Sequence, residues 1–150
     1  MSRSVPLASP SRAWALLALR VSLGWLLVVW GGDKLTNVEH AVRVSEGFYL
    51  GLLTGPSALQ AFGVVQTLAG LLVVLGFARS LAYPFLAAVA LVTFLAVWKS
   101  IVDPLGLVLE GGNPVFYSSA VILAGTFVLW SFRSDDRLAL DARRARPPGA

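Results

Sequence analysis

The stretch RVSLGWLLVVWGGDK, residues 20–34, decides the fold, because it places two charged residues on one line of an otherwise apolar helix. At about 100° per residue, one line on this helix passes close to Arg20, Gly24, Leu27, Gly31 and Lys34. Lipid tolerates leucine and tryptophan far better than arginine. We therefore expect this face to point into the protein, and the stretch predicts a membrane-spanning helix that packs against other helices.

The composition agrees with a membrane protein and excludes several kinds of chemistry. Of the 150 residues, 57% are apolar and 13% are charged, which is not the balance of a soluble domain. The chain has no cysteine, so its own residues form no disulfide, thiolate metal site or iron–sulfur cluster. It has one histidine and one methionine, which argues against a haem with two side-chain ligands from this chain.

Apolar runs long enough to cross a bilayer occur four times, separated by glycine, proline and charged residues. We place the spans at about 13–30, 58–78, 81–98 and 115–132. Residues 1–12 and 133–150 are polar and rich in arginine, and we expect both to be disordered tails. The predicted fold class is all-α: a polytopic membrane protein with a four-transmembrane-helix bundle in residues 13–132.

The distribution of basic residues predicts the orientation of the four spans. Three of them, Lys34, Arg43 and Lys99, fall on one side, and the other side holds Arg3, Arg12, Arg79, Arg133, Arg137, Arg143, Arg144 and Arg146. Positive charges concentrate on the cytoplasmic side, so this bias places both termini in the cytoplasm. Topology therefore accounts for the net charge of +4, and we expect the lipid bilayer rather than nucleic acid as a partner.

The two outer loops, residues 31–56 and 99–114, contain apolar patches that are too short to span the membrane. We expect short interfacial or re-entrant segments there, which form a cap over the outer end of the bundle.

Arg20 is the costliest residue in the apolar spans, and the sequence supports more than one interpretation of it. In a structural role it snorkels to the inner surface, or bonds neighbouring carbonyl groups or Gln66. In a functional role it binds an anion or a quinone oxygen, and a contact with a partner protein is a third interpretation. Gln66 and Thr67, at mid-depth of the second span, suit hydrogen bonds between helices.

A second group of polar residues stands at the outer ends of spans one and three. Boundary charges of this kind serve either as membrane anchors or, under two semi-buried loops, as the lining of a small outward-facing pocket; here they are Asp33, Lys34, Lys99 and Asp103, beside Trp30 and Trp98. His40 has no second ligand at metal-binding spacing, so we predict no metal site.

Motifs for self-sufficient catalysis are missing from the sequence. It holds no phosphate-binding loop, nucleophile elbow or paired-carboxylate motif, and no cofactor follows from its residues. For Gly24, Gly31 and Gly70 we expect a role in close helix packing rather than in chemistry.

The pattern Arg20-x3-Gly24-x6-Gly31-x2-Lys34-Leu35 resembles the opening of the DoxX family of small four-helix bacterial membrane proteins, and so does the stretch GVVQTLAGLLVVLGFARSLAYP, residues 63–84. The resemblance implies a bacterial inner-membrane location and, for better-known members, a membrane subunit of a quinone-linked redox system that handles sulfur or oxidative stress. Members often carry an acidic residue in the second helix where Gln66 stands here. If that carboxylate relays protons or bonds a quinol in the family, its absence here argues against such catalysis at this position.

Three hypotheses for function follow. The first is a membrane subunit that associates with a redox partner protein and binds a quinone or a small anion between the first two spans. The second is a scaffold or assembly protein whose polar residues only lock the bundle. The third is a small transporter for a solute or anion, which needs a homo-oligomer to build a pathway. In none of them is the chain an enzyme by itself; it is at most a subunit of an oxidoreductase.

Overall fold

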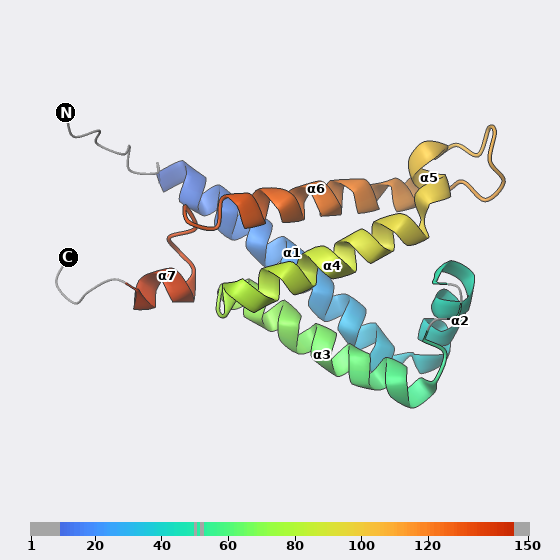
Figure 1. Ribbon diagram of the computed structural model, residues 1–150, viewed down its shortest axis with the longest axis horizontal. Coiled ribbons are helices and arrows are strands. Elements are labelled where there is room, and N and C mark those ends of the chain that lie inside the picture. Colours follow the sequence, from blue (N-terminus) through green and yellow to red (C-terminus); the bar gives the residue numbers. More distant parts are fainter. Residues whose placement is uncertain (1–9, 50, 52, 146–150) are drawn as a thin grey trace.

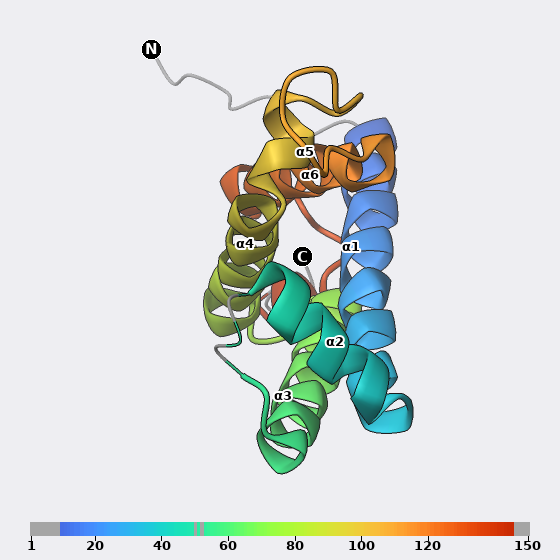
Figure 2. The ribbon, with the colours of Figure 1, turned by 90° about the vertical axis from the view of Figure 1, so that its right-hand side faces the viewer.

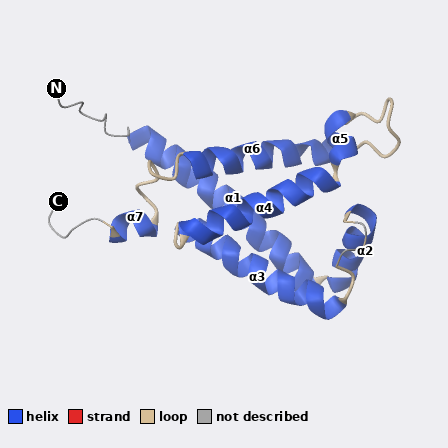
Figure 3. Ribbon diagram, viewed as in Figure 1, coloured by secondary structure: helices blue, strands red, loops and turns tan. Residues whose placement is uncertain are grey.

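The computed structural model describes residues 10–49, 51 and 53–145, and in these ranges the secondary structure is helical, without strands (Figure 3). Four helical segments are long and apolar enough to cross a membrane. They are α1 (Pro10–Thr36), α3 (Pro56–Leu75), α4 (Arg79–Ala96) and the short helix η1 (Pro114–Tyr117) with α6 (Ser118–Ser131). The all-α fold with four spans is thereby confirmed.

The helix bounds differ from the predicted spans mainly in α1, which is longer at both ends. It begins at Pro10, inside the predicted tail of residues 1–12, of which residues 1–9 lie outside the described part. It also continues through Gly31 and Gly32 to Thr36, whose hydroxyl donates to the Gly32 carbonyl oxygen at 3.0 Å. The glycines do not end the helix, because Gly31 is held against α3.

Glycines set the spacing between α1 and α3, which pack antiparallel. A Cβ added at Gly24 would lie 2.9 Å from the Gly70 carbonyl oxygen, and one added at Gly70 would lie 2.7 Å from that of Gly24. About two turns further along α1, Gly31 and Gly63 face each other in the same way. Any side chain at these four positions would force the two backbones apart, so α1 and α3 form a tight pair.

The other two spans form a second pair, α4 with α6. Figure 1 shows that α3 and α4 meet at the turn around Arg79 and diverge toward their other ends, and the view in Figure 2 agrees. We call the first of these ends the Arg79 end. The opposite end, where α1 finishes and α3 begins, is the Lys34 end. Between them, a buried core joins all four helices through Leu23, Leu27, Val73, Leu86 and Leu129.

Short helices mark the two ends. At the Lys34 end, α2 (Val38–Phe48) follows α1 and lies across the gap between α3 and α4, whereas α5 (Trp98–Val102) follows α4 (Figure 2). At the Arg79 end, α7 (Leu140–Arg144) lies beside the turn between α3 and α4 (Figure 1).

The expectation of a disordered segment from residue 133 onward is corrected for residues 133–145, which fold against the Arg79 end. Asp136 and Ala139 are fully buried there, and α7 follows them. The sequence stretch is polar, but its carboxylates find cationic and N–H partners on α1 and on the turn between α3 and α4, which stabilises it. Residues 146–150 lie outside the described part.

Candidate functional site

Arg20 lies at the Arg79 end and is 2% exposed, because the folded C-terminal segment covers it. Its Nη1 lies 3.4 Å from Asp136 Oδ2. The guanidinium also donates to the carbonyl oxygens of Leu75, at 3.5 Å, and Leu138, at 3.4 Å. Tyr83 Oη donates to the same Asp136 oxygen at 3.1 Å. Arg20 therefore bonds to carbonyl groups, as one interpretation held, but its principal partner is Asp136 rather than Gln66.

The turn that joins α3 to α4 is fastened to α7. Gly76 ends α3 with a φ of +65°, and a Cβ there would meet Arg20 Nη1 and Ala139, so only glycine fits. Asp141 accepts from the N–H groups of Ala78, at 3.2 Å, and Arg79, at 3.0 Å. Partial burial raises the pKa of Asp141, but these hydrogen bonds and the Arg79 charge outweigh it, so that the pKa lies below its usual value.

The Lys34 end holds a pocket of about 490 Å³, within the size range of small-molecule sites. The α1–α3 pair forms one side, α4 forms the other, and α2 lies over it. Its walls are mostly apolar and include Leu59, Phe62, Phe85, Val89 and Val92. The rings of Phe62 and Phe85 pack together with centroids 6.4 Å apart. The pocket is thus an apolar space bounded by four helices.

Lys34 is the basic group of this pocket. Its Nζ donates to the Trp30 carbonyl oxygen at 3.1 Å and lies 5.7 Å from the centre of the Phe62 ring. In the described part of the chain, no carboxylate oxygen lies within 4.0 Å of this ammonium group. The neighbouring Asp33 instead contacts His40, with 2.8 Å between Oδ2 and Nδ1. Lys34 therefore carries a charge with hydrogen-bonding capacity to spare.

Two further polar side chains in the pocket are buried without hydrogen-bond partners among the described residues. They are Gln66, whose Oε1 is unpaired although the residue is 1% exposed, and Ser45 on α2, whose Oγ is unpaired at 4% exposure. Buried polar groups are normally satisfied, so each unpaired group calls for an explanation. Both residues line the pocket, whereas three other buried atoms without partners, Arg20 Nε, Thr67 Oγ1 and Asp136 Oδ1, belong to residues that do not line it.

The helix α2 is attached to the bundle by contacts at each end. Near its start, Asn37 donates to Asp33 Oδ1 at 3.1 Å, next to the Asp33–His40 contact. Near its finish, the Tyr49 hydroxyl lies 3.2 Å from the Thr93 hydroxyl on α4. These contacts hold α2 as a cover over the pocket.

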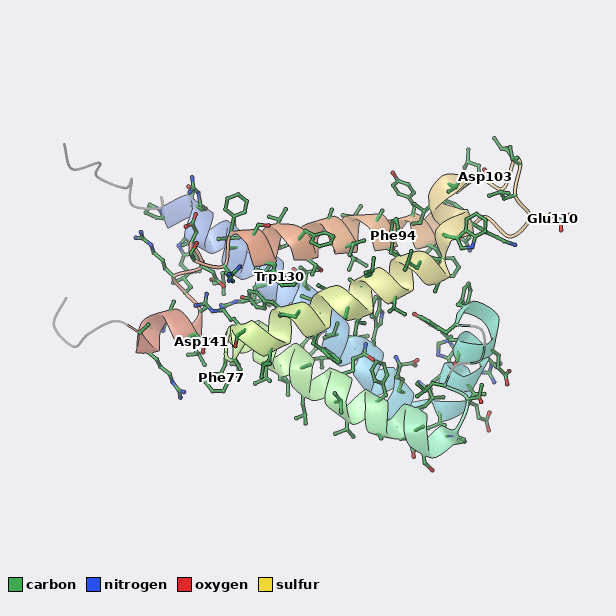
Figure 4. The ribbon with its side chains drawn as sticks, in the orientation of Figure 1. Phe77, Phe94, Asp103, Glu110, Trp130 and Asp141 are labelled. Carbon is green, nitrogen blue, oxygen red and sulfur yellow. The ribbon has the colours of Figure 1, made fainter. Side chains whose placement is uncertain are left out.

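The predicted outer cluster separates into two places. Trp30, Asp33 and Lys34 line the pocket, whereas Trp98 and Lys99 are exposed on α5. Figure 4 shows Asp103 and Glu110 on the connection after α5, away from α2. There, hydrogen bonds from the N–H groups of Leu109 and Val108 lower the pKa of Asp103. This connection does not line the pocket, so of the two outer loops only the first contributes to its cover.

The ligand site expected between the first two spans stays a prediction, but the structure leaves no space at the interface itself. The glycine contacts close the interface of α1 with α3, and the space opens toward α4 instead. Sequence reasoning also missed Tyr49, Phe62 and Phe85. No direct signal for these three residues exists in the sequence. The cover of the pocket was indicated, because residues 38–48 form one polar and one apolar helix face, which is typical of a helix lying on an apolar surface.

Among the described residues, no group of three or more His, Cys, Asp or Glu side chains could hold a metal ion. The site instead offers a mostly apolar space with an ammonium group, an amide and hydroxyl groups. That combination suits an amphiphilic organic ligand held by hydrogen bonds.

Fold and pocket define the class: an integral membrane protein with four spans, closed at one end by its own C-terminal segment and open at the other around a ligand-sized pocket. The chain belongs to the DoxX family, whose model matches residues 15–99. That range contains every pocket-lining residue and Arg20, but not Asp136. Comparison with curated proteins and with solved structures gives no match.

Proposed function

We propose that this protein is the membrane subunit of a quinone-linked redox system and that it holds the quinone in the pocket at the Lys34 end. The observation that carries the proposal is this pocket, in which buried polar side chains without partners converge on a mostly apolar space. A quinone needs both, since its ring and tail are apolar and its oxygen atoms accept hydrogen bonds. Electrons would pass between the quinone and a partner protein.

The pocket favours this function over the two alternatives. A scaffold that only locks its own helices needs no ligand-sized apolar space bordered by a basic side chain. A transporter must open both ends in turn, which here would break a buried ion pair between Arg20 and Asp136. Breaking a buried pair by separating its charges costs several kcal/mol, about 3–5 when one partner is removed. A site that exchanges its ligand only at the Lys34 end avoids this cost.

We further propose a bacterial inner-membrane location, with the Arg79 end in the cytoplasm. Described arginines gather at that end, namely Arg12, Arg79, Arg133, Arg137, Arg143 and Arg144. Among the described lysines and arginines, Lys34, Arg43 and Lys99 lie at the other end. The positive-inside rule then makes the pocket face the outer leaflet.

Purification from the native membrane in a mild detergent tests the redox proposal. The expected result is a quinone in the solvent extract of the purified protein, together with a partner protein that carries a redox cofactor. A control preparation of the Phe62→Trp variant, which fills the pocket with a larger ring, should retain the partner and lose the quinone. A wild-type preparation with neither quinone nor partner would refute the proposal.

The orientation is testable because the chain has no cysteine of its own. Cysteines placed singly at Glu46, exposed on α2, and Ser80, exposed at the turn between α3 and α4, report the two sides. A membrane-impermeant maleimide should label Glu46→Cys in intact cells and Ser80→Cys only after lysis. The reverse pattern would overturn the orientation.

A further inference from the structure

We propose that Lys34 and Gln66 bind the ligand at two different depths of the pocket, which we call the first and second levels. The pocket would therefore select a ring that carries oxygen atoms on opposite edges. The inference deepens the proposed function and rests on it, because it names the chemistry that the same pocket recognises. It adds two residues that determine specificity and excludes amphiphiles with a single polar end.

The first level is set by Lys34 beside Phe62. An ammonium group offers three N–H donors and no acceptor, and only the Trp30 carbonyl oxygen accepts from it in the described part of the chain. Its position 5.7 Å from the Phe62 ring centre directs it to the aromatic wall of the pocket. A ligand oxygen at this level would accept from Lys34.

The second level is set by Gln66, one turn deeper along α3. Gln66 follows Phe62 by four residues, which separates the two levels by about 6 Å along the helix axis. Gln66 lines the pocket, is 1% exposed and has no hydrogen-bond partner at its buried Oε1. A terminal amide can present its oxygen to a hydroxyl group or its NH₂ to a carbonyl group, so Gln66 suits either redox form of a ring oxygen.

The surface between these levels is aromatic and apolar. The rings of Phe62 on α3 and Phe85 on α4 pack at a tilt of 49°, and Val89 lies on the α4 side of the pocket. A flat ring can lie against this pair while its two oxygen atoms reach Lys34 and Gln66. A six-membered ring with oxygen on opposite carbons spans about one helical turn, as the two levels require. A fatty acid has one polar end and would leave Gln66 unpaired.

Binding to the full-length protein in nanodiscs, measured by calorimetry, tests the inference with three probes that share one alkyl tail. They are a para-benzoquinone, the matching phenol with one ring oxygen, and a saturated fatty acid. We expect the quinone to bind at least about tenfold more tightly than either other probe, because only the quinone pairs both residues.

Two variants with matched controls locate the contacts. Lys34→Met and Gln66→Leu should each weaken quinone binding about tenfold, and Gln66→Leu should leave phenol binding unchanged. The controls are Lys99→Met and Gln60→Leu, an exposed lysine at the same end and an exposed glutamine on the same helix, and neither should alter binding. The melting temperature of each variant reports whether it is folded.

The outcomes separate the inference from the proposed function. If the quinone binds and Gln66→Leu leaves its affinity unchanged, two-level recognition is wrong although the quinone site remains. If the fatty acid binds as tightly as the quinone, selection for a ring with two oxygens is wrong. If no probe binds to the folded wild-type protein, the proposed function fails as well.

Discussion

The two basic residues of α1, Arg20 and Lys34, stand on the same face of one helix but meet opposite surroundings. Arg20 is buried at 2% exposure, with a carboxylate and two carbonyl oxygens around its guanidinium. Lys34 faces a pocket, with one backbone acceptor and no carboxylate in contact among the described residues. Arg20 pairs with a carboxylate inside the fold, although its Nε and Asp136 Oδ1 have no hydrogen-bond partner among the described residues. Lys34 has no carboxylate in contact and borders the pocket, so its ammonium group is the one within reach of a ligand.

The same contrast holds for the two ends of the bundle. At the Arg79 end, residues 133–145 bring carboxylates to the cationic and N–H groups of α1 and of the turn between α3 and α4. At the Lys34 end, α3 and α4 diverge and α2 only covers the gap (Figure 1). The closed end gives the molecule a rigid base, and the open end can then accept a ligand without loss of the fold.

The largest expected effect comes from the closed end, where removal of one partner leaves a buried charge. Arg20→Met should lower the free energy of unfolding by about 3–5 kcal/mol. Arg20→Met combined with Asp136→Leu should recover most of this loss, because apolar pairs replace buried ion pairs well. Denaturant unfolding in detergent micelles measures both.

The matched control is the exposed pair between Arg12 and Asp135, 3.0 Å apart at the same end. Arg12→Met should cost at most about 1 kcal/mol, as surface ion pairs do. Equal losses for Arg12→Met and Arg20→Met would contradict a special role for the buried pair.

The second effect concerns Gly76, where the backbone and the contacts both require glycine. Gly76→Ala should cost about 2–3 kcal/mol, because a left-handed conformation costs about 1–2 kcal/mol for a residue with a Cβ and the methyl group also displaces Arg20 and Ala139. Gly47→Ala is the control, since a Cβ there meets nothing within 4 Å. Thermal unfolding of both variants compares them. A loss at Gly76 no larger than at Gly47 would mean that residues 133–145 do not pack on this turn.

A smaller effect is the pH dependence of the closed end through Asp141. Its pKa is lowered from the model-compound value of 3.8 in the folded protein, so its stabilisation is complete above that value. The stabilisation is lost as the pH falls below about 4 and passes through the lowered pKa. Carboxylates titrate between roughly pH 6 and pH 3. Over this range, the Asp141→Asn variant should therefore lose less stability than the wild-type protein. An unchanged pH profile would argue against the contact with Ala78 and Arg79.

The smallest effect on stability is expected at the open end. Lys34→Met should lower the free energy of unfolding by no more than about 1 kcal/mol, because the half-buried ammonium group loses one hydrogen bond but leaves no buried charge unpaired. Unfolding under the same conditions as for Arg20→Met gives a direct comparison. A loss similar to that of Arg20→Met would show that Lys34 is structural and would remove the contrast between the two ends.

Hydropathy predicts the four spans, and the glycines Gly24, Gly31 and Gly70 predict close packing, but Gly63 and the pairing of α1 with α3 come from the structure. The seven-residue interval from Gly24 to Gly31 recurs from Gly63 to Gly70 in the antiparallel helix. The ordered segment 133–145 was not predictable in this way. Its partners are far away in sequence, and Asp136 is one acidic residue in a polar stretch until Arg20 and Tyr83 meet it.

The candidate site could be predicted only in part. Charge and depth placed Trp30, Asp33 and Lys34 at the mouth of a site and Gln66 inside the bundle, and the structure brings all four to one pocket. Trp98 and Lys99 stand at the end of an apolar span, as Trp30 and Lys34 do. Because α4 diverges from α3, however, Trp98 and Lys99 lie away from the pocket. The aromatic wall, Phe62 and Phe85, depends on that divergence and has no signature in an apolar sequence.

The central claim is that the ligand site lies at the open end, and photolabelling of the full-length protein in nanodiscs with an azido-quinone tests it most directly. Mass spectrometry of the digested protein then identifies the labelled residues. The account predicts adducts within residues 41–49, 59–66 and 85–93, which line the pocket, and their loss when unlabelled quinone is in excess. Adducts confined to residues 133–145 or to the neighbourhood of Arg20, or labelling that excess quinone does not reduce, would contradict it.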